Sequence, residues 1–329
     1  MSNIEWYNIA DSANKLRALS VIIGGRGIGK TYSAIDYLVN LNVPFIYMRN
    51  TDVQLKESST AFGNPFKRWN IDHNRDIKII KEGMHSVIVE KLDDSEVNYL
   101  GYAVALSTFE NLRGVDLSDV EYVLFDEFIE RRTLTFQQFE TFANFYETVN
   151  RNRELQGREP LKVILLSNAQ KLGNPILAGY GFIPIIENMI RNGQKEKIEK
   201  HFYISLPESN VSDAKKNTAN YVLTAGSKFA DEALDNKFSY DSFYNIKKKP
   251  LREYYPVCSI DDIYIWKHKA KFIYYVCRSR SDKVQEFSSK DNKTQFLRTY
   301  GMTLRDANAA GKVFYSDFTI KMQLLEVIK

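Results

Sequence analysis

The stretch VIIGGRGIGKT, from Val21 to Thr31, is an apolar run that enters a glycine-rich turn and ends in Lys-Thr. It matches the phosphate-loop pattern G-x-x-x-x-G-K-[ST] at every fixed position. Glycines are needed because successive backbone N–H groups must converge on phosphates with no Cβ in the way, and the following helix adds its dipole. The alternative is a glycine-rich turn that happens to carry Lys-Thr. The strand expected before the loop and the helix expected over residues 31–39 favour the phosphate loop.

The residues of this loop predict a nucleotide site. In such a loop the lysine, here Lys30, reaches the β- and γ-phosphates, and the hydroxyl of Thr31 ligates Mg²⁺. We therefore predict ATP and Mg²⁺ as cofactors. The nucleotide-binding residues expected in the loop are Gly24, Gly25, Arg26, Gly27, Ile28, Gly29, Lys30 and Thr31.

A second apolar run, residues 122–125, ends in two acids, Asp126 and Glu127. A buried strand of this kind serves phosphate-loop enzymes by holding Mg²⁺ with the first carboxylate and orienting the attacking water with the second. We expect Asp126 to hold the metal and Glu127 to act as the catalytic base. Many strands end in acids at the surface, so this prediction depends on the phosphate loop earlier in the chain.

Two further buried strands are expected at residues 44–49 and 163–166, and each ends in polar residues. Ligands of open α/β sheets bind outside the carboxyl ends of the strands. Arg49 is thus a candidate nucleotide contact and Asn168 a candidate sensor of the γ-phosphate, with an ordinary strand-end arginine and a strand-end cap as the alternatives. Alternating residues from 77 to 105 predict antiparallel strands that form an inserted or flanking hairpin.

Composition limits the classes of protein to consider. With 329 residues and 44% hydrophobic content, the chain fits two domains or one enlarged α/β domain. Two cysteines make no disulfide framework, and four scattered histidines show no zinc spacing. No run approaches the length of a membrane span, and no signal peptide is evident. We expect a soluble protein in a reducing, intracellular setting with no membrane partner.

Charge is distributed unequally along the chain. Residues 1–190 hold 20 Lys/Arg against 24 Asp/Glu, whereas residues 191–329 hold 25 against 17, so the two parts carry −4 and +8. A basic part joined to a nucleotide-binding part suggests a polyanion as partner, and a solvated lysine-rich surface is the equal alternative. The DNA-binding candidates are Lys247, Lys248, Lys249, Lys267 and Lys271.

Changes in composition suggest three parts. Residues 1–211 are predicted to form a P-loop ATPase domain, in which an aromatic helix over 136–150 leads to Arg151 and Arg153. Residues 212–240 are a predicted linker or lid of short helices. Residues 241–329 are a predicted basic, nucleic-acid-binding domain, with antiparallel strands expected near 263–266, 272–276 and 284–287.

Taken in order, five segments resemble the genome-packaging ATPases of small protein-primed tailed phages: IGGRGIGKTY, FIYMRN, VLFDEFI, TVNRNRE and LLSNA. The resemblance covers most of residues 18–208 and weakens beyond residue 212. It implies an α/β fold of the additional-strand (ASCE) P-loop type with a predominantly parallel sheet. It also implies a smaller α+β, RNase H-like C-terminal domain that keeps only a vestige of a nuclease.

The same resemblance implies a function. Such ATPases form a homo-oligomeric ring, a pentamer, that docks transiently on the portal of a procapsid in the cytoplasm of the infected bacterial host. They use ATP to move double-stranded DNA into the procapsid, and a structural RNA on the procapsid is a further candidate partner. The resemblance assigns a role across the subunit interface to Arg151, with Arg113 as a second candidate. The family's lysine after the second strand is replaced here by Asp52.

Other functions remain open at this point. A small-molecule phosphotransferase would use the same loop with an acceptor pocket and a closing lid, and a helicase or replication ATPase would share the hydrolytic residues. A non-enzymatic scaffold is disfavoured by the intact Lys30, Thr31, Asp126 and Glu127. Nuclease activity is predicted to be absent from residues 241–329. Two-metal cleavage needs several converging carboxylates, whereas the adjacent Asp261 and Asp262 would point to opposite faces of a strand.

Overall fold

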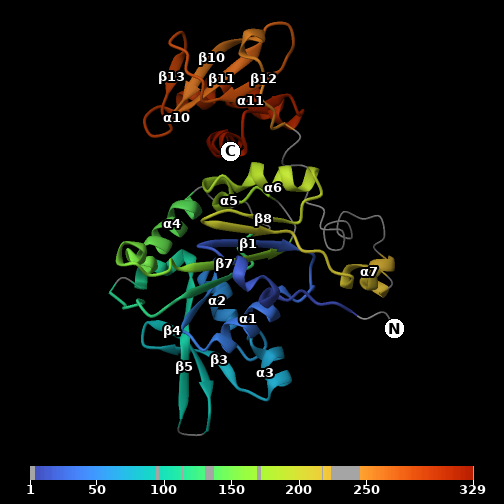
Figure 1. Cartoon of the computed structure of the whole chain (residues 1–329). Helices are drawn as coiled ribbons and strands as arrows, with labels where there is room; N and C mark the ends of the chain where they lie inside the picture. The colour runs from blue at the N-terminus through green and yellow to red at the C-terminus, as the bar shows by residue number, and fades with distance from the viewer. Residues whose placement is uncertain are drawn as a thin grey trace. The chain divides into compact units, whose positions relative to one another are not determined.

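The computed structural model describes residues 4–93, 96–112, 114–129, 137–168, 172–216, 218–223 and 245–328. The chain divides into two compact units, each with its own sheet (Figure 1). The first unit spans Met1–Thr133, Phe139–Lys171 and Pro184–Phe238. The second unit spans Leu134–Gln138, Leu172–Ile183 and Ser239–Lys329, so two short segments that precede residue 211 group with the C-terminal part.

The sheet of the first unit has nine strands in the order β3-β4-β5-β2-β6-β7-β1-β9-β8. Its central strands, from β5 to β9 in that order, are all parallel, and antiparallel strands lie at both edges. The α/β class with a predominantly parallel sheet is thereby confirmed. The strands are β1 (Leu19–Gly24), β2 (Phe45–Arg49), β3 (Ile77–Glu82), β4 (His85–Lys91), β5 (Val97–Ala105), β6 (Tyr122–Asp126), β7 (Lys162–Asn168), β8 (Glu196–Ile198) and β9 (Phe202–Ser205).

The central strands are buried on both faces, which explains why they are continuous apolar runs in the sequence. On one face, Leu124 of β6 belongs to the same cluster as Ile35 and Leu38 of α1 (Lys30–Leu41). On the other face, the next residue, Phe125, packs against Phe142 of α4 (Gln137–Asn150) with ring centroids 5.9 Å apart. Phe142 and Phe145 of α4 are therefore core, whereas Phe139 and Tyr146 are only partly buried.

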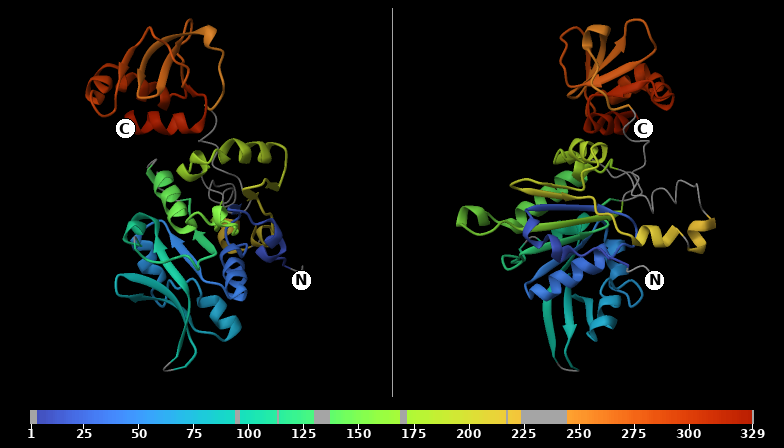
Figure 2. Two further views of the ribbon diagram at one scale, coloured as in Figure 1. Left: turned by 60° about the vertical axis from the view of Figure 1, so that its left-hand side comes forward. Right: turned by 45° about the vertical axis from the view of Figure 1, so that its right-hand side comes forward.

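The segment from residue 77 to residue 105 extends the same sheet rather than forming a separate hairpin (Figure 2). Strands β3, β4 and β5 are antiparallel to one another, as expected, but β5 also pairs in parallel with β2. Gly101 allows this pairing, because a Cβ there would collide with the carbonyl oxygen of Phe45. Alternation in the sequence predicts that these residues form strands, but it does not indicate which strands pair with one another.

Short helices connect these strands. The first unit contains η1 (Ile9–Lys15), α2 (Asp52–Ser58), α3 (Lys67–His73), η2 (Leu106–Leu112), η3 (Arg153–Gln156), α7 (Val211–Lys216) and α8 (Ala219–Leu223). Two further helices are α5 (Pro175–Gly179) and α6 (Phe182–Arg191). Among the residues that the structure describes, no helix is both long and apolar enough to cross a membrane.

The second unit has a five-stranded sheet in the order β13-β10-β11-β12-β14. Strands β10, β11 and β12 form the expected antiparallel set. The strand expected at 284–287 exists, but it is parallel to β10, so its predicted antiparallel orientation is wrong. The elements are η5 (Leu251–Glu253), β10 (Tyr254–Ile260), β11 (Ile263–His268), β12 (Tyr274–Cys277), β13 (Gln285–Phe287), α10 (Lys293–Phe296), η6 (Leu297–Gly301), α11 (Met302–Ala309), β14 (Val313–Tyr315) and α12 (Phe318–Ile328).

Candidate functional site

The predicted phosphate loop connects β1 to α1 at the carboxyl end of the central parallel strands. Gly27 and Gly29 have φ of +68° and +98°, in the left-handed region that glycine adopts without a steric penalty. Gly29 is the N-cap of α1 and makes no side-chain capping hydrogen bond. The amides of the first turn are therefore oriented as an anion-binding helix terminus requires.

Lys30 lies in the floor of the loop, and only 6% of its surface is exposed. Its ammonium donates hydrogen bonds to the carbonyl oxygens of Gly24 at 3.0 Å and Gly25 at 2.7 Å, and to Oδ1 of Asn168 at 3.1 Å. Burial lowers the pKa of Lys30 to about 8. The structure thus brings together two residues, Lys30 and Asn168, that are 138 positions apart in the chain.

The metal residues predicted from the sequence also meet. The hydroxyl of Thr31 donates to Oδ1 of Asp126 at 3.0 Å, and Asp126 is 6% exposed at the end of β6. Burial raises the pKa of Asp126, and the nearby Arg49 opposes that effect. Mg²⁺ is usually held by one or two carboxylates together with phosphates and water. One hydroxyl and one carboxylate beside a phosphate loop fit this preference.

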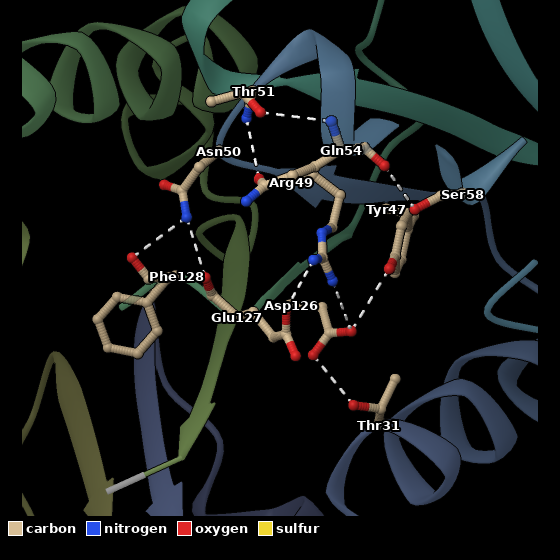
Figure 3. A network of polar contacts seen from close by, with 10 residues as sticks. All are labelled: Thr31, Tyr47, Arg49, Asn50, Thr51, Gln54, Ser58, Asp126, Glu127 and Phe128. Carbon is tan, nitrogen blue, oxygen red and sulfur yellow. Dashed lines mark hydrogen bonds and ion pairs between the residues drawn. The ribbon is translucent and has the colours of Figure 1, made fainter. Parts of the chain in front are cut away.

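Arg49, a candidate nucleotide contact, lies between the two acids (Figure 3). Its guanidinium pairs with Oδ2 of Asp126 at 3.3 Å and with Oε2 of Glu127 at 2.7 Å. Glu127 has a φ of +52°, and its side chain is 57% exposed. Glu127 thus leaves the strand and reaches toward the solvent, whereas Asp126 stays buried.

Two residues that bond to Asp126 and Glu127 in this network were not predicted from the sequence. The hydroxyl of Tyr47 donates to Oδ2 of Asp126 at 3.4 Å, and the side-chain amide of Asn50 donates to the carbonyl oxygen of Glu127 at 2.9 Å (Figure 3). Tyr47 lies two positions before Arg49 on β2, so the two-residue period of a strand places both side chains on one face. That period is a signal from which Tyr47 could have been found.

A cavity of about 260 Å³ lies over the loop. It is lined by loop residues together with Asp126, Glu127 and Asn168, and also by Tyr32, which was not predicted from the sequence. The backbone amides of the loop, one ammonium and two carboxylates therefore border the same space. Such a site can hold a polyphosphate with its metal ion beside an acid that is able to accept a proton.

Arg151 and Arg153 lie near the amino ends of the central parallel strands, whereas the phosphate loop lies at their carboxyl ends. Arg151 follows α4 and pairs with Oδ1 of Asp116 at 2.9 Å, and its side chain is 45% exposed. The side chain of Asn150 accepts a hydrogen bond from the amide of Leu161, just before β7 begins. The phosphate loop instead follows the end of β1, which is parallel to β7. The seven residues of β7 place these two ends of the strands about 20 Å apart, at about 3.3 Å per residue.

The other predicted residues are dispersed. Arg113 lies outside the described residues, and Arg153 is buried, with hydrogen bonds to the carbonyl oxygens of Ser118 and Val120. In the second unit, Lys247, Lys248 and Lys271 are exposed. Lys249 lies 4.1 Å from the ring centroid of Phe314, and Lys267 lies 5.6 Å from that of Phe272.

Comparisons with known proteins agree with the resemblance predicted from the sequence. The DNA packaging protein of Bacillus phage B103 is 30% identical over 241 residues, which cover 71% of this chain and 68% of that protein. The DNA packaging protein of Bacillus phage phi29 is 27% identical over 252 residues, covering 74% and 69%.

Two solved structures have the same fold over almost the whole chain. The Phi-28 gp11 DNA packaging motor has a TM-score of 0.62 at 19% identity and covers 98% of both chains. The bacteriophage Phi-29 viral genome packaging motor assembly has a TM-score of 0.62 at 18% identity and covers 98% of this chain and 99% of its own. The sequence profile of the podovirus DNA encapsidation protein (Gp16) matches residues 1–294. The chain therefore belongs to the podovirus DNA encapsidation protein (Gp16) family.

Proposed function

We propose that this chain is an ATP-hydrolysing motor subunit that moves double-stranded viral DNA into a procapsid. The observation that carries the ATPase assignment is the meeting of Lys30, Thr31 and Asp126 at one cavity beside the phosphate loop. Membership of the DNA encapsidation family supports the coupling of this ATPase to packaging. We propose that the protein acts in the cytoplasm of the infected bacterium and docks transiently on the procapsid.

The order of the strands supports the additional-strand (ASCE) class. Strand β7 lies between β1, which precedes the phosphate loop, and β6, which ends in Asp126. In the second unit, β13 is parallel to β10 beside an antiparallel set of three strands, which supports an RNase H-like domain. Strand β14 lies at the far edge, next to β12. The division into residues 1–211, 212–240 and 241–329 stays part of this proposal.

In the proposed mechanism, the loop amides and Lys30 hold the β- and γ-phosphates of ATP. Thr31 and Asp126 would hold Mg²⁺, which when bound neutralises charge that develops on the phosphate oxygens. Glu127 accepts the proton of the attacking water, since its carboxylate is exposed beside the cavity. Arg49 keeps the two carboxylates in place, and the amide of Asn168 reaches the γ-phosphate side next to Lys30.

We propose that Arg151 acts on the ATP of a neighbouring subunit in a ring, which the family resemblance suggests is a pentamer. Arg151 cannot reach the phosphate loop of its own chain, because the length of the parallel strands separates them. Its side chain is 45% exposed near the amino ends of these strands. A guanidinium that arrives only in the assembled ring would stabilise the transferring phosphoryl group. Arg113 stays a second candidate for the same role.

The proposed partners are double-stranded DNA, the portal of the procapsid and a structural RNA on the procapsid. Exposed Lys247, Lys248 and Lys271 are the DNA contacts we would test first, because phosphates are neutralised by accessible cations. Lys249 and Lys267 lie over aromatic rings and are more constrained.

We propose that the second unit has no nuclease activity. Asp261 and Asp262 lie in the turn between β10 and β11, so the expectation that they occupy opposite faces of a strand is wrong. The carboxylate of Asp262 pairs with Arg278 at 2.8 Å, and that of Asp261 accepts a hydrogen bond from the amide of Ser289 at 2.9 Å. Within the described parts of the chain, no three His, Cys, Asp or Glu residues are grouped so that they could hold a metal ion. Two-metal cleavage would need such a group.

Two variants and one substrate test the proposal. Lys30→Ala should lose both nucleotide affinity and turnover, whereas Glu127→Gln should bind ATP but not hydrolyse it, because only the activation of water is impaired. Duplex DNA should stimulate the wild-type enzyme, and no phosphorylated metabolite should form. Hydrolysis at the wild-type rate by both variants would show that the site is wrongly placed, and strand displacement without translocation would favour a helicase.

A further inference from the structure

Two segments that flank the ATPase core lie against the outer side of the phosphate loop. The amide of Tyr7 donates to the carbonyl oxygen of Ile28 at 2.9 Å, and a Cβ on Gly24 would lie 3.0 Å from Pro207. The two segments are also joined to each other, because Glu5 bonds through its backbone to the side chains of Asn210 and Ser209. Residues 5–7 and the segment after β9 therefore form one layer, joined by hydrogen bonds, that packs against the phosphate loop.

Lys215 of α7 makes the most direct contact between this layer and the loop. Its ammonium donates to the carbonyl oxygen of Arg26 at 2.7 Å and to that of Gly27 at 3.3 Å. A Cβ on Gly27 would lie 2.5 Å from this ammonium, so a larger residue there would displace Lys215, and the φ of +68° at this position also favours glycine. Loss of hydration beside these carbonyls lowers the pKa of Lys215, and the nearby Arg26 adds to the effect.

These contacts bear on how the loop binds phosphate. In a trans peptide the carbonyl and the amide of the same plane point in opposite directions. Lys215 and the Tyr7 amide together hold the carbonyls of Arg26, Gly27 and Ile28 on the outer side. The amides of the three following residues, Gly27, Ile28 and Gly29, are therefore turned to the inner side, where successive N–H groups form an anion-binding concavity.

We propose that Lys215 is a positioning residue for the phosphate loop, which it holds from outside so that the loop amides converge on a nucleotide. This inference rests on the proposed function, since it assigns the loop to nucleotide phosphates. The pattern G-x-x-x-x-G-K-[ST] contains no such residue, because Lys215 is 188 positions away from Gly27. An organised loop raises the affinity for both ATP and ADP, because the ordering has already occurred before the nucleotide arrives.

Three variants of the full chain separate this role from a general effect on folding. Lys215→Met keeps the length of the side chain but has no donor, and Lys215→Arg keeps the charge and the donors. Lys197→Met is the matched control, because Lys197 lies in the edge strand β8 and pairs with Glu199 at 2.7 Å instead of with the loop. Calorimetric titration with ADP and with a non-hydrolysable ATP analogue measures the affinity of each variant directly.

We expect Lys215→Met to bind both nucleotides about tenfold more weakly or worse, which is the factor for losing one hydrogen bond to a charged group. Lys215→Arg should retain most of the affinity, and Lys197→Met all of it. When the ATP concentration is varied, Lys215→Met should raise KM far more than it lowers kcat, because Lys215 does not touch the reacting atoms. Without nucleotide, the amides of residues 27–29 should exchange hydrogen faster in Lys215→Met while core strands exchange as in the wild type.

Three results would overturn the proposal: wild-type affinity in Lys215→Met, an equal loss of affinity in Lys197→Met, or amide exchange that rises uniformly over the unit. Lys215→Arg that binds as weakly as Lys215→Met would also contradict it, because the donors would then be irrelevant. If the wild type bound no nucleotide, the proposed ATPase function itself would fail, which is a distinguishable outcome.

Discussion

Arg151 and Arg153 are two residues apart, yet their replacement by alanine should affect different properties of the protein. Arg153 is 3% exposed and donates to the carbonyl oxygens of Ser118 and Val120, which lie in the connection that leads into β6. Arg153→Ala leaves the carbonyl of Val120 without its charged donor, whereas the carbonyl of Ser118 still accepts a hydrogen bond from Arg158 at 3.1 Å. Arg151 instead makes its contacts with Asp116 and Val115 at the surface. We therefore expect Arg153→Ala to affect stability and Arg151→Ala to affect turnover.

The size of the stability effect follows from the contacts. A net hydrogen bond to a charged group contributes about 1.5–3 kcal/mol, so losing two, with partial replacement by water, should cost about 3 kcal/mol. For a unit of this size that corresponds to a decrease in Tm of about 6–12 °C. Ion pairs on the surface contribute little to stability, so Arg151→Ala should unfold close to the wild type. Differential scanning calorimetry of the three proteins measures the comparison.

Turnover tests the other half of the reasoning. Arg151→Ala should bind ATP and lose DNA-stimulated hydrolysis, since the proposed arginine serves a neighbouring subunit. Lys30→Ala lacks ATP but still presents Arg151, so rings that contain both variants should regain part of the activity that each lacks alone. Mixed rings that form but stay inactive, or an Arg151→Ala protein with normal turnover, would refute the role across the interface. Equal destabilisation by Arg151→Ala and Arg153→Ala would refute the structural distinction.

Three further predictions concern pH, salt and nuclease activity. Burial lowers the pKa of Lys30 to about 8, and phosphates bind the charged form of this side chain. The affinity for ADP should therefore fall as pH rises above about 8, and titration calorimetry should show that binding is accompanied by proton uptake. An affinity that stays constant up to about pH 9.5 would contradict this. The logarithm of the DNA affinity should fall with the logarithm of the salt concentration, with a slope of about −0.9 per phosphate contacted. The double variant Lys247→Ala, Lys248→Ala should reduce the magnitude of this slope by about two, without a preference for any duplex sequence. Filter binding over a series of salt concentrations can test both points. Plasmid DNA should stay intact with Mn²⁺, and nicking that disappears in Asp261→Ala would show a nuclease.

The sequence by itself was sufficient to identify the residues that meet at the candidate nucleotide site, because the pattern that marks them is local. Lys30 and Thr31 are adjacent in a loop whose glycines allow only a few conformations, and Asp126 ends a strand whose apolar run identifies it. The two-residue period of strands and the periodic aromatic residues of α4 are likewise local properties, so the α/β class and the presence of this helix were predictable.

Only the tertiary structure decided which distant groups meet. The pairing of β5 with β2, the parallel orientation of β13 and the bond between Arg49 and both acids depend on chain paths that no local pattern encodes. The different surroundings of Arg151 and Arg153, alike in sequence, follow from one pointing to the surface and the other into the protein. Lys215 reaches the loop only because the segment after β9 returns along it, and hydrogen bonds over such separations are set by packing rather than by neighbours in the sequence.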